Sequence, residues 1–334
     1  MEDASGFVSE ILEHYASCYE ELLAVPVVRG TKSEEETFAG AIFTKTTEIY
    51  VPISGRGIQG ATSHCLGQNF SKMFDVWYED KQGQKQNCWQ TSWGLSTRSI
   101  GAMIMVHSDD KGLVLPPRVA QTQVVVIPVV KTGDDIKAVQ GYAEGVYNEL
   151  KAAGLGVAFD DRENYTPGHK YNHWELRGVP IRLEIGPQEL AKKEVRCCKR
   201  HDLKWKQNVA NVELPKTIKA LLEDIHKEMY DKALQARLSH QKEVDNWKDF
   251  MAAILERNIC MTPWCGVRAC EETVKEKSKE ESLEALQDNE DETLLTGSAK
   301  TLCIPDEYKP LPGCAKCFHC GKKAEKWALW GRTY

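Results

Sequence analysis

Hydrophobic positions in the first part of the chain follow a helical period and then a strand period. Apolar side chains recur every three or four residues at Val8, Ile11, Leu12, Tyr15, Tyr19, Leu22 and Leu23, which predicts a helix whose apolar face lies on a sheet. Strands are predicted at about residues 42–53 and within residues 75–93, where two aromatic-rich runs flank a polar turn at Gly83. Antiparallel strands with flanking helices indicate an α+β layer.

A second pattern begins after the adjacent prolines Pro116 and Pro117, which interrupt whatever precedes them. An apolar run at residues 123–130 is followed by a helix that Asp134 or Asp135 would begin, with a glycine at Gly154 to end it. The apolar face of this helix is formed by Ile136, Val139, Ala143, Val146 and Leu150. The strand GVAF follows, so this segment predicts a parallel, right-handed β–helix–β unit in an α/β domain.

The last helix of that domain is expected from about Pro215 to about Leu238. Beyond it, the charged run at residues 271–294 predicts a solvated helix and loop. We therefore predict three domains, at residues 1–117, 118–238 and 239–334.

Composition narrows the function classes. The chain has 43 Lys plus Arg against 49 Asp plus Glu, a formal net charge of -6, so any contact with RNA has to be local. No window approaches the roughly 18 to 20 apolar residues that cross a bilayer, and the amphipathic, acidic start does not resemble a secretory leader. We expect a cytosolic protein without a membrane partner.

The chain has 12 cysteines, and without a secretory signal these indicate thiols and metal sites rather than disulfides. Seven lie after residue 259, at Cys260, Cys265, Cys270, Cys303, Cys314, Cys317 and Cys320. The pair Cys265 and Cys270 and the pair Cys317 and Cys320 can together close one tetrahedral zinc site of the structural kind. Free buried thiols are the alternative, and Cys260, Cys303 and Cys314 are substitute ligands. Adjacent Cys197 and Cys198 are poorly spaced for joint chelation and are interpreted as structural.

Two glycine-containing stretches combine polar side chains with backbone freedom. They are GRGIQGATSHCLGQNF at residues 55–70 and GLSTRSIGAMIMVH at residues 94–107. Residue types alone leave two readings equally open, one of loops with a core helix and one of a functional site.

The strings IQGATSHCLGQNFSKMF, NCWQTSWGLSTRSIGAMIMVHSDDKGLVLPPRVA and DRENYTPGHKYNHWELRGVPIRLEIGP closely resemble prolyl-tRNA synthetases of the eukaryotic and archaeal type, including the prolyl half of the fused glutamyl-prolyl enzyme. The resemblance runs essentially from residue 7 to the last residue. It implies a fragment of the class II antiparallel sheet carrying the third signature motif, an α/β anticodon-binding domain, and a small zinc-binding α+β domain.

By this resemblance, Arg98 in GLSTRSIG lies against the adenine of ATP and is a catalytic residue together with His64. The resemblance assigns Gln59 and Thr62 to ATP and its Mg²⁺, Ser96 to a hydroxyl contact with ATP, and His64 to the proline pocket. The implied reaction joins L-proline to tRNA(Pro) through prolyl-adenylate, with positioning and charge neutralisation supplying most of the acceleration.

The first and second class II motifs would precede the given sequence. We therefore expect a fragment of a longer enzyme, inactive alone; a product complemented by a separate N-terminal piece and a non-catalytic tRNA-binding or regulatory relative are the alternatives. The resemblance also implies a homodimer in the full-length enzyme and membership of a multi-synthetase complex.

Unpaired anticodon bases are read by stacking on aromatic rings and by hydrogen bonds to base edges. The candidate contacts in the second domain are Arg162, Lys170, Tyr171, His173, Trp174 and Glu175. The stretch AKKEVRCCKRHDLKWK has seven Lys or Arg and two acidic residues, so it is either a phosphate-binding surface or an ordinary basic strand. In the family, a terminal tyrosine approaches the active site, and Tyr334 is the matching residue.

Overall fold

A computed structural model describes residues 2–130, 135–287 and 297–334. Contacts divide the chain into two compact units, and each is described by itself. The first comprises residues 1–21, 25–106 and 234–334, and the second comprises residues 22–24 and 107–233. Strands of the first and third predicted segments thus belong to one unit, while the three-domain division stays a prediction.

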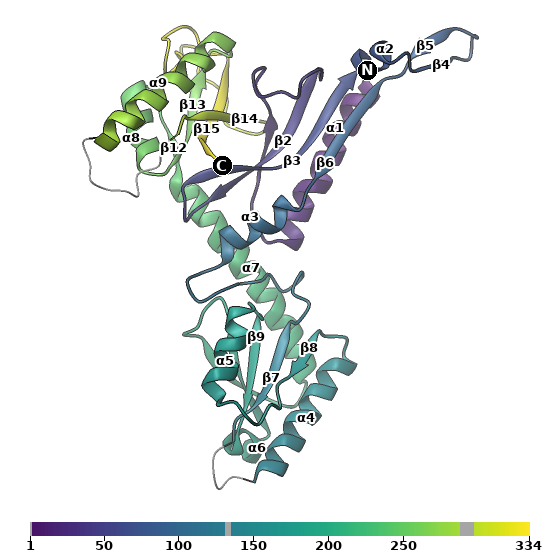
Figure 1. Ribbon diagram of the computed structural model, residues 1–334, viewed down its shortest axis with the longest axis vertical. Coiled ribbons are helices and arrows are strands. Elements are labelled where there is room, and N and C mark those ends of the chain that lie inside the picture. The colour runs from purple at the N-terminus through teal and green to yellow at the C-terminus, as the bar shows by residue number, and fades with distance from the viewer. Residues whose placement is uncertain (1, 131–134, 288–296) are drawn as a thin grey trace. The chain divides into compact units, whose positions relative to one another are not determined.

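The first unit is built on an eight-stranded sheet in the order β12-β13-β15-β14-β1-β2-β3-β6 (Figure 1). Its strands are β1 (Val28–Thr31), β2 (Phe43–Val51), β3 (Arg56–Gly67), β6 (Gln90–Leu95), β12 (Gln241–Glu243), β13 (Ile259–Trp264), β14 (Lys300–Pro305) and β15 (Lys326–Thr333). Two pairings join distant parts of the chain: β1 runs antiparallel to β14, and β15 runs parallel to β3. The C-terminal strands therefore complete the sheet that the N-terminal strands begin.

The predicted first helix is confirmed as α1 (Glu2–Ser17), which continues into a π-helical turn, Cys18–Leu22. Val8, Leu12 and Tyr19 are buried on the face that lies against β2, β3 and β6. Placing Leu22 on the apolar face was wrong, because its side chain is exposed. The wider π turn rotates the last residues away from the helical period on which that prediction rested.

Reading residues 55–70 as a loop was wrong, because most of them form the long strand β3. The lack of a side chain at Gly57 and Gly60 lets neighbouring side chains pack closely against the strand, and neither glycine needs unusual backbone angles. A Cβ at Gly57 would lie 2.9 Å from Leu302 Cδ1, and one at Gly60 would lie 2.8 Å from Thr47 Oγ1 and 2.9 Å from Tyr19 Cζ. Only Gly55 and Gly67, at the two ends, need a positive φ.

The first unit also contains the helices α2 (Asn69–Met73), α3 (Arg98–His107), α8 (Trp247–Leu255) and α9 (Arg268–Gln287). The last residue of α3, His107, is assigned to the second unit. The predicted charged helix is confirmed as α9, although Glu271, Val274, Ser278 and Ser282 form a buried face. The predicted loop after it, at residues 288–294, lies outside the described residues. Phe250, Trp264, Phe318 and Trp330 pack in the core below the C-terminal strands.

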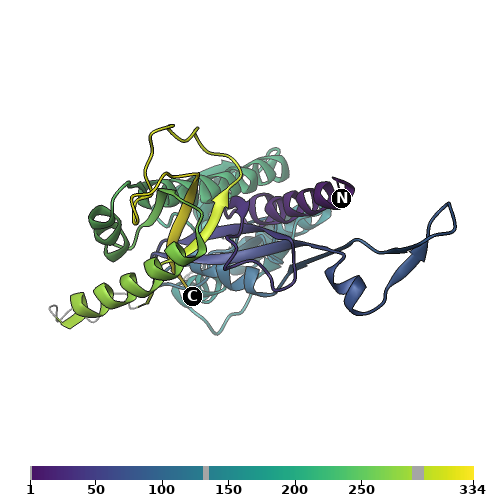
Figure 2. The same ribbon diagram turned by 90° about the horizontal axis from the view of Figure 1, so that it is seen from above.

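The predicted hairpin around Gly83 is confirmed as β4 (Trp77–Glu79) and β5 (Lys85–Asn87), a separate two-stranded ribbon. It projects away from the rest of its unit in both views (Figures 1 and 2). Its residues Trp77 and Tyr78 are exposed, and so is Trp93 on the sheet's edge strand β6. The aromatic content that suggested these strands therefore does not serve a core of the described chain.

The second unit is an α/β domain with the strand order β11-β10-β9-β7-β8. Its elements are β7 (Val124–Pro128), α4 (Ile136–Ala152), β8 (Val157–Phe159), α5 (Pro167–Leu176), β9 (Ile181–Ile185), α6 (Pro187–Lys192), β10 (Glu194–Lys199), β11 (Lys206–Ala210) and α7 (Leu214–His240), which belongs to this unit up to Ala233. The parallel pairing of β7 with β8 confirms the predicted β–helix–β unit.

Local signals for this unit were read correctly. Asp135 caps α4 by accepting a hydrogen bond from the Ala138 N–H at 3.1 Å, whereas Asp134 lies outside the described residues. Alternate residues of β7 face opposite layers, with Val124 and Val126 in the core of α4 and α7, and Val125 and Ile127 packed against α5. Among the described residues, no helix is both long and apolar enough to cross a membrane.

The close contacts at Gly60 predict the effect of a single methyl group. Gly60→Ala should lower the free energy of unfolding of the first unit by about 1–3 kcal/mol, because the new Cβ overlaps Thr47 and Tyr19. Gly101→Ala in α3 is the matched control: its Cβ meets nothing within 4 Å, so stability should be unchanged or raised by up to about 1 kcal/mol. Urea unfolding followed by tryptophan fluorescence measures both, and equal midpoints would contradict the packing argument.

Candidate functional site

A cavity of about 420 Å³ in the first unit brings together three of the residues singled out in the sequence. Gln59 of β3, Arg98 at the start of α3 and Tyr334 after β15 all line it. The remaining lining residues are mostly polar: Lys32, Glu36, Glu48, Gly57, Ile58, Met105, Lys300, Thr301 and Thr333. Residues far apart in the sequence therefore meet because β15 pairs with β3.

Arg98 presents an exposed guanidinium at this cavity. Its side chain is exposed, and Arg98 makes no ion pair with a carboxylate in the described part of the chain. Ser96 shapes the turn from β6 into α3: its Oγ accepts from the Arg98 N–H at 3.3 Å, and its carbonyl accepts from Ser99 Oγ at 2.6 Å. Ser96 thus holds the backbone from which Arg98 projects.

Tyr334 is held by its strand and by a cation. Arg332 and Thr333 pair with Arg56 and Gly57 of β3. The Arg56 guanidinium lies 5.4 Å from the centroid of the Tyr334 ring, and Arg56 Nη1 donates to the Thr333 carbonyl at 3.2 Å. These contacts hold the last residues in place, although a frayed end is the ordinary expectation.

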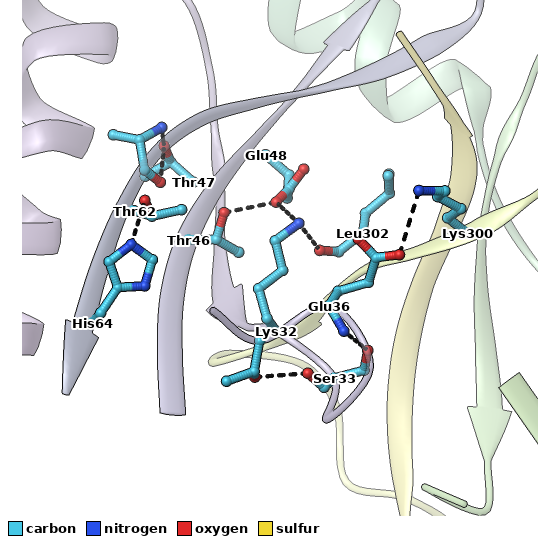
Figure 3. A network of polar contacts seen from close by, with 12 residues as sticks. Lys32, Ser33, Glu36, Thr46, Thr47, Glu48, Thr62, His64, Lys300 and Leu302 are labelled. Atoms are coloured by element: carbon cyan, nitrogen blue, oxygen red, sulfur yellow. Dashed lines mark hydrogen bonds and ion pairs between the residues drawn. The ribbon is translucent and has the colours of Figure 1, made fainter. Parts of the chain in front are cut away.

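His64 and Thr62 lie on the same face of the sheet (Figure 3). The Phe38 N–H donates to Thr44 Oγ1 at 3.1 Å. The His64 ring lies between two hydroxyls, with Nδ1 2.9 Å from Thr44 Oγ1 and Nε2 3.0 Å from Thr62 Oγ1, so in the neutral ring one nitrogen donates and the other accepts. Burial lowers the pKa of His64 below its ordinary value, which favours the neutral ring.

A buried ion pair beside the cavity was not found from the sequence. Lys32 Nζ lies 2.7 Å from Glu48 Oε1 and donates to the Leu302 carbonyl at 2.9 Å, and Thr46 Oγ1 donates to Glu48 at 2.7 Å (Figure 3). Burial raises the pKa of Glu48 even though Lys32 lowers it. The signal in the sequence was Glu48 inside an otherwise uncharged part of a strand, where an acidic side chain needs a partner.

Four cysteines of the C-terminal segment converge on one point. The Sγ atoms of Cys265, Cys270, Cys317 and Cys320 all lie within 4.8 Å of one another. The Cys270–Cys317 and Cys265–Cys320 sulfur distances are 3.8 and 3.7 Å. A tetrahedron of sulfurs at about 2.3 Å from a zinc ion has edges of about 3.8 Å, whereas a disulfide bond is about 2.05 Å long. This cluster can therefore hold a metal ion.

The electrostatics of the cluster also suit a cation. The hydrogen bond with Cys270 and several backbone N–H groups lower the pKa of Cys317, against the effect of burial. The same hydrogen bond raises the pKa of Cys270. His319 Nδ1 lies 3.5 Å from Cys270 Sγ. By contrast, burial raises the pKa of Cys197 to about 12 and that of Cys198 to about 11, as expected for structural thiols.

In the second unit, the predicted RNA contacts divide into two groups, and the first surrounds Asp160. Arg162 donates to both carboxylate oxygens of Asp160 at 2.8 and 2.7 Å, Trp174 Nε1 donates to it at 2.8 Å, and Lys170 Nζ donates to its carbonyl at 3.0 Å. Burial disfavours the charge on Asp160, but these donors outweigh it and lower its pKa to about 2. Asp160 was missed in the sequence because its role depends on partners gathered by the fold.

Arg162 and Lys170 line a cavity of about 650 Å³ at the carboxyl end of β7. The loop before α5 adds Tyr165, an exposed ring that stacks on His169 at 4.4 Å and lies 4.9 Å from the Arg162 guanidinium. Tyr165 is a second residue that the sequence analysis missed. The signal was an aromatic residue directly before Thr166 and Pro167, which begin α5.

The second group faces another part of the unit. The Arg182 guanidinium lies 4.1 Å from the Tyr171 ring centroid and pairs with Glu175 at 2.6 Å, so these two candidates are occupied by a structural contact. Arg177 Nη1 donates to His173 Nδ1 at 3.1 Å. In the basic stretch, Lys199 pairs with Glu228 and Arg200 pairs with Asp109, while Lys192, Lys193, Arg196, Lys204 and Lys206 remain exposed.

Comparisons with known proteins show which families and folds the chain resembles. A family model described as "Anticodon binding domain" matches residues 123–221, and one described as "Prolyl-tRNA synthetase, C-terminal" matches residues 247–334. The chain is 45% identical over 332 residues to the cytoplasmic proline–tRNA ligase of Arabidopsis thaliana, covering 99% of the chain and 60% of that protein. It is 44% identical over 341 residues to the bifunctional glutamate/proline–tRNA ligase of Drosophila melanogaster, covering 100% of the chain and 20% of that protein.

A solved structure is also similar over the whole chain. The crystal structure of prolyl-tRNA synthetase from Cryptosporidium parvum, in complex with halofuginone and AMPPNP, has a TM-score of 0.93 and 44% identity, and the match covers 100% of this chain and 66% of that one. The matched domains and the fold thus define part of an aminoacyl-tRNA synthetase. The chain belongs to the prolyl-tRNA synthetase family, and it spans less than two thirds of the relatives described above.

The sulfur geometry predicts metal binding by four named ligands. Purified protein should hold one equivalent of zinc, and Cys317→Ser should weaken zinc affinity at least about 100-fold, because losing a ligand costs more than losing a residue that only hydrogen-bonds a ligand. Cys314→Ser, which removes an exposed cysteine outside the cluster, is the matched control and should leave affinity unchanged. Competition with a chromogenic chelator measures both; equal affinities in the two variants would exclude this ligand set.

Proposed function

We propose that this chain supplies part of the site for ATP-dependent ligation of L-proline to tRNA(Pro) through prolyl-adenylate. The observation that carries this proposal is the single cavity lined by Gln59, Arg98 and Tyr334, on a sheet that also bears Thr62 and His64. Family membership supports the reaction class. In finer terms, the first unit is a class II catalytic fragment joined to a zinc-binding α+β segment.

In this proposal Arg98 lies against the adenine, because its planar cation can stack on a π face and is not consumed by an ion pair. Gln59 and Thr62 bind ATP, and a magnesium ion, when bound, offsets the charge of the phosphates. The neutral His64 lines the proline pocket, where a hydrogen bond with Thr62 holds its ring. Ser96 acts by holding the backbone of Arg98.

The chemistry needs positioning more than side-chain covalent steps. The proline carboxylate attacks the α-phosphate of ATP and pyrophosphate leaves; a ribose hydroxyl of the tRNA terminus then attacks the prolyl carbonyl and AMP leaves. A polar cavity with fixed donors favours this sequence by holding the reactants and by neutralising developing charge. Tyr334 closes one side of the cavity, held there by Arg56.

We further propose that the second unit binds the anticodon of tRNA(Pro). Tyr165, His169 and Arg162 offer exposed ring and guanidinium faces beside the cavity at the end of β7, which suits stacking with unpaired bases. Asp160 and the buried Lys170 hold these groups in place, and Trp174 supports Asp160. Tyr171, His173 and Glu175 complete the candidate set as supporting residues.

The exposed cations of β10 and the β10–β11 turn suit the phosphate backbone. We also propose that zinc occupies the cysteine cluster as a structural ion, and that the protein acts in the cytoplasm, as the name of the Arabidopsis relative states for that protein. A homodimer of the full-length enzyme and a multi-synthetase complex are further proposals; the fused Drosophila relative supports an association with other synthetases.

Loss of the cation at position 98 tests the nucleotide site. Arg98→Ala should weaken ATP binding about tenfold, roughly 1.4 kcal/mol, because it removes the stacking cation. Lys279→Ala, an exposed charge change on α9 away from the cavity, should have no effect. Isothermal titration calorimetry with ATP measures both variants, and a wild-type affinity in Arg98→Ala would remove Arg98 from the site.

Proline-dependent exchange of pyrophosphate into ATP separates the two functional readings. Exchange by this chain alone supports a complete adenylation site. An exchange-inactive chain that still binds the anticodon stem-loop supports the non-catalytic, tRNA-binding alternative, unless adding the upstream part of a relative restores exchange.

Stacking in the second unit predicts a separate result. Tyr165→Ala should weaken binding of the tRNA(Pro) anticodon stem-loop by about 1–3 kcal/mol, because an exposed ring beside the cavity is lost. Lys219→Ala, an exposed charge change on α7, is the control and should have a smaller effect that disappears at high salt. Fluorescence anisotropy at two salt concentrations measures both variants. Unchanged binding by Tyr165→Ala would shift the proposed site away from the α5 loop.

A further inference from the structure

A short segment, Lys32–Phe38, lies between the face that bears His64 and the C-terminal part of the first unit; we call it the strap. Two hydrogen bonds between side chains and backbone form within it: Ser33 Oγ accepts from the Glu36 N–H at 3.2 Å, and Thr37 Oγ1 donates to the Ser33 carbonyl at 2.7 Å. The Lys32 N–H pairs with the Thr44 carbonyl at 2.8 Å. The strap is therefore a defined turn rather than a free loop.

One side of the strap is held by the C-terminal segment. Ser33 Oγ donates to Glu271 Oε1 at 2.8 Å, and both residues are buried, with exposures of 1% and 3%. Around this buried bond, Arg268 pairs with Glu35 at 2.7 Å and Lys300 pairs with Glu36 at 3.5 Å (Figure 3 shows the second pair). The Ser33–Glu271 hydrogen bond is the one of these contacts that is buried, whereas the two ion pairs are partly exposed.

The other end of the strap determines the surroundings of His64. Phe38 ends the strap, and its ring centroid lies 4.9 Å from that of His64. Its N–H donates to the same Thr44 hydroxyl that bonds His64 Nδ1. The Phe38 side chain is 48% exposed, so core packing alone does not hold it. The strap's backbone therefore places Phe38, which contacts the His64 ring and shares the Thr44 hydroxyl with it.

The contact at Glu271 is adjacent in sequence to a metal ligand. Cys270 belongs to the four-cysteine cluster, and Arg268, Cys270 and Glu271 share the first turn of α9. A bound ion would fix Cys270 to within the tolerance of a metal–sulfur bond. Because consecutive residues of a helical turn move together, a change at Cys270 displaces Glu271 and, through it, Ser33.

From this chain of contacts we infer that metal loading of the cysteine cluster is coupled to the hydrogen-bonded surroundings of the His64 ring through Glu271, Ser33 and the strap. Glu271 and Ser33 are positioning residues in this device. The inference goes beyond the proposed function and does not require it, since it concerns the order of the strap and the state of the His64 ring. The alternative is that Lys32 and Glu48 alone hold the strap, whatever the state of the cluster.

The first experiment follows the strap in the intact chain with and without zinc. Hydrogen exchange should become at least about tenfold faster at the Glu36 and Phe38 amides when EDTA removes the metal, and the side-chain ¹⁵N resonances of His64 should shift. With zinc fully bound, Glu271→Ala should reproduce both changes, whereas Glu271→Gln should not, because its amide oxygen still accepts from Ser33. Unchanged exchange at these amides in Glu271→Ala at full zinc occupancy would overturn the inference, even if zinc removal unfolds the whole segment.

The second experiment uses reciprocity, because a coupling between two sites acts equally in both directions. Ser33→Ala is not a ligand change, yet it should weaken zinc affinity about fivefold or more. Thr37→Val removes a hydrogen bond within the strap but none to the C-terminal segment, so it is the matched control and should keep the wild-type affinity. Equal zinc affinities in Ser33→Ala and wild type would refute the coupling. Neither experiment uses ligase activity, so failure of the proposed function leaves both results interpretable.

Discussion

Backbone pairing between strands from opposite parts of the sequence is the constraint on which the larger unit depends. Strand β1 has β2 on one side and β14 on the other, and β3 receives the end of β15 in parallel register. Without these pairings, the polar groups along buried strands would lose their hydrogen-bond partners, which is costly. The same pairings carry Tyr334 to the cavity that Gln59 and Arg98 line, so the site exists only in the folded unit.

The buried charges where β2 meets the C-terminal strands are neutralised by pairing. Lys32 satisfies both Glu48 and the Leu302 carbonyl, which joins β2 to the C-terminal strands. A buried pair of this kind adds little net stability over apolar packing, but removing one partner leaves an uncompensated charge. The Lys32–Glu48 pair instead fixes the start of the strap at the cavity. Asp160 has the corresponding role in the second unit, where one carboxylate orients Arg162 and Trp174.

The two units use different solutions to present polar groups. The first places them on one face of a largely antiparallel sheet, with α1 covering part of the other face. The second places them where parallel strands end and a new helix begins, beside Tyr165 and Lys170. In both, the candidate binding groups lie on or next to regular elements, and buried partners hold their orientation. The four-cysteine cluster adds a third kind of constraint, since an ion can fix a turn that has little apolar core of its own.

Local periodicity in the sequence determined the elements whose signals are short-range. The helices α1, α4, α7 and α9, the Gly83 hairpin and the parallel unit around Asp135 all follow from spacing and caps, because those interactions join residues near one another in the chain. Long collinear strings determined the family, and cysteine spacing determined a plausible ligand set. Tertiary structure alone decided that Gly57 and Gly60 belong to a strand and that Tyr171 and Glu175 contact Arg182. It also decided that Glu48 pairs with Lys32 and Asp160 with Arg162. The physical reason is that packing clearance and charge compensation depend on neighbours that only the fold brings together.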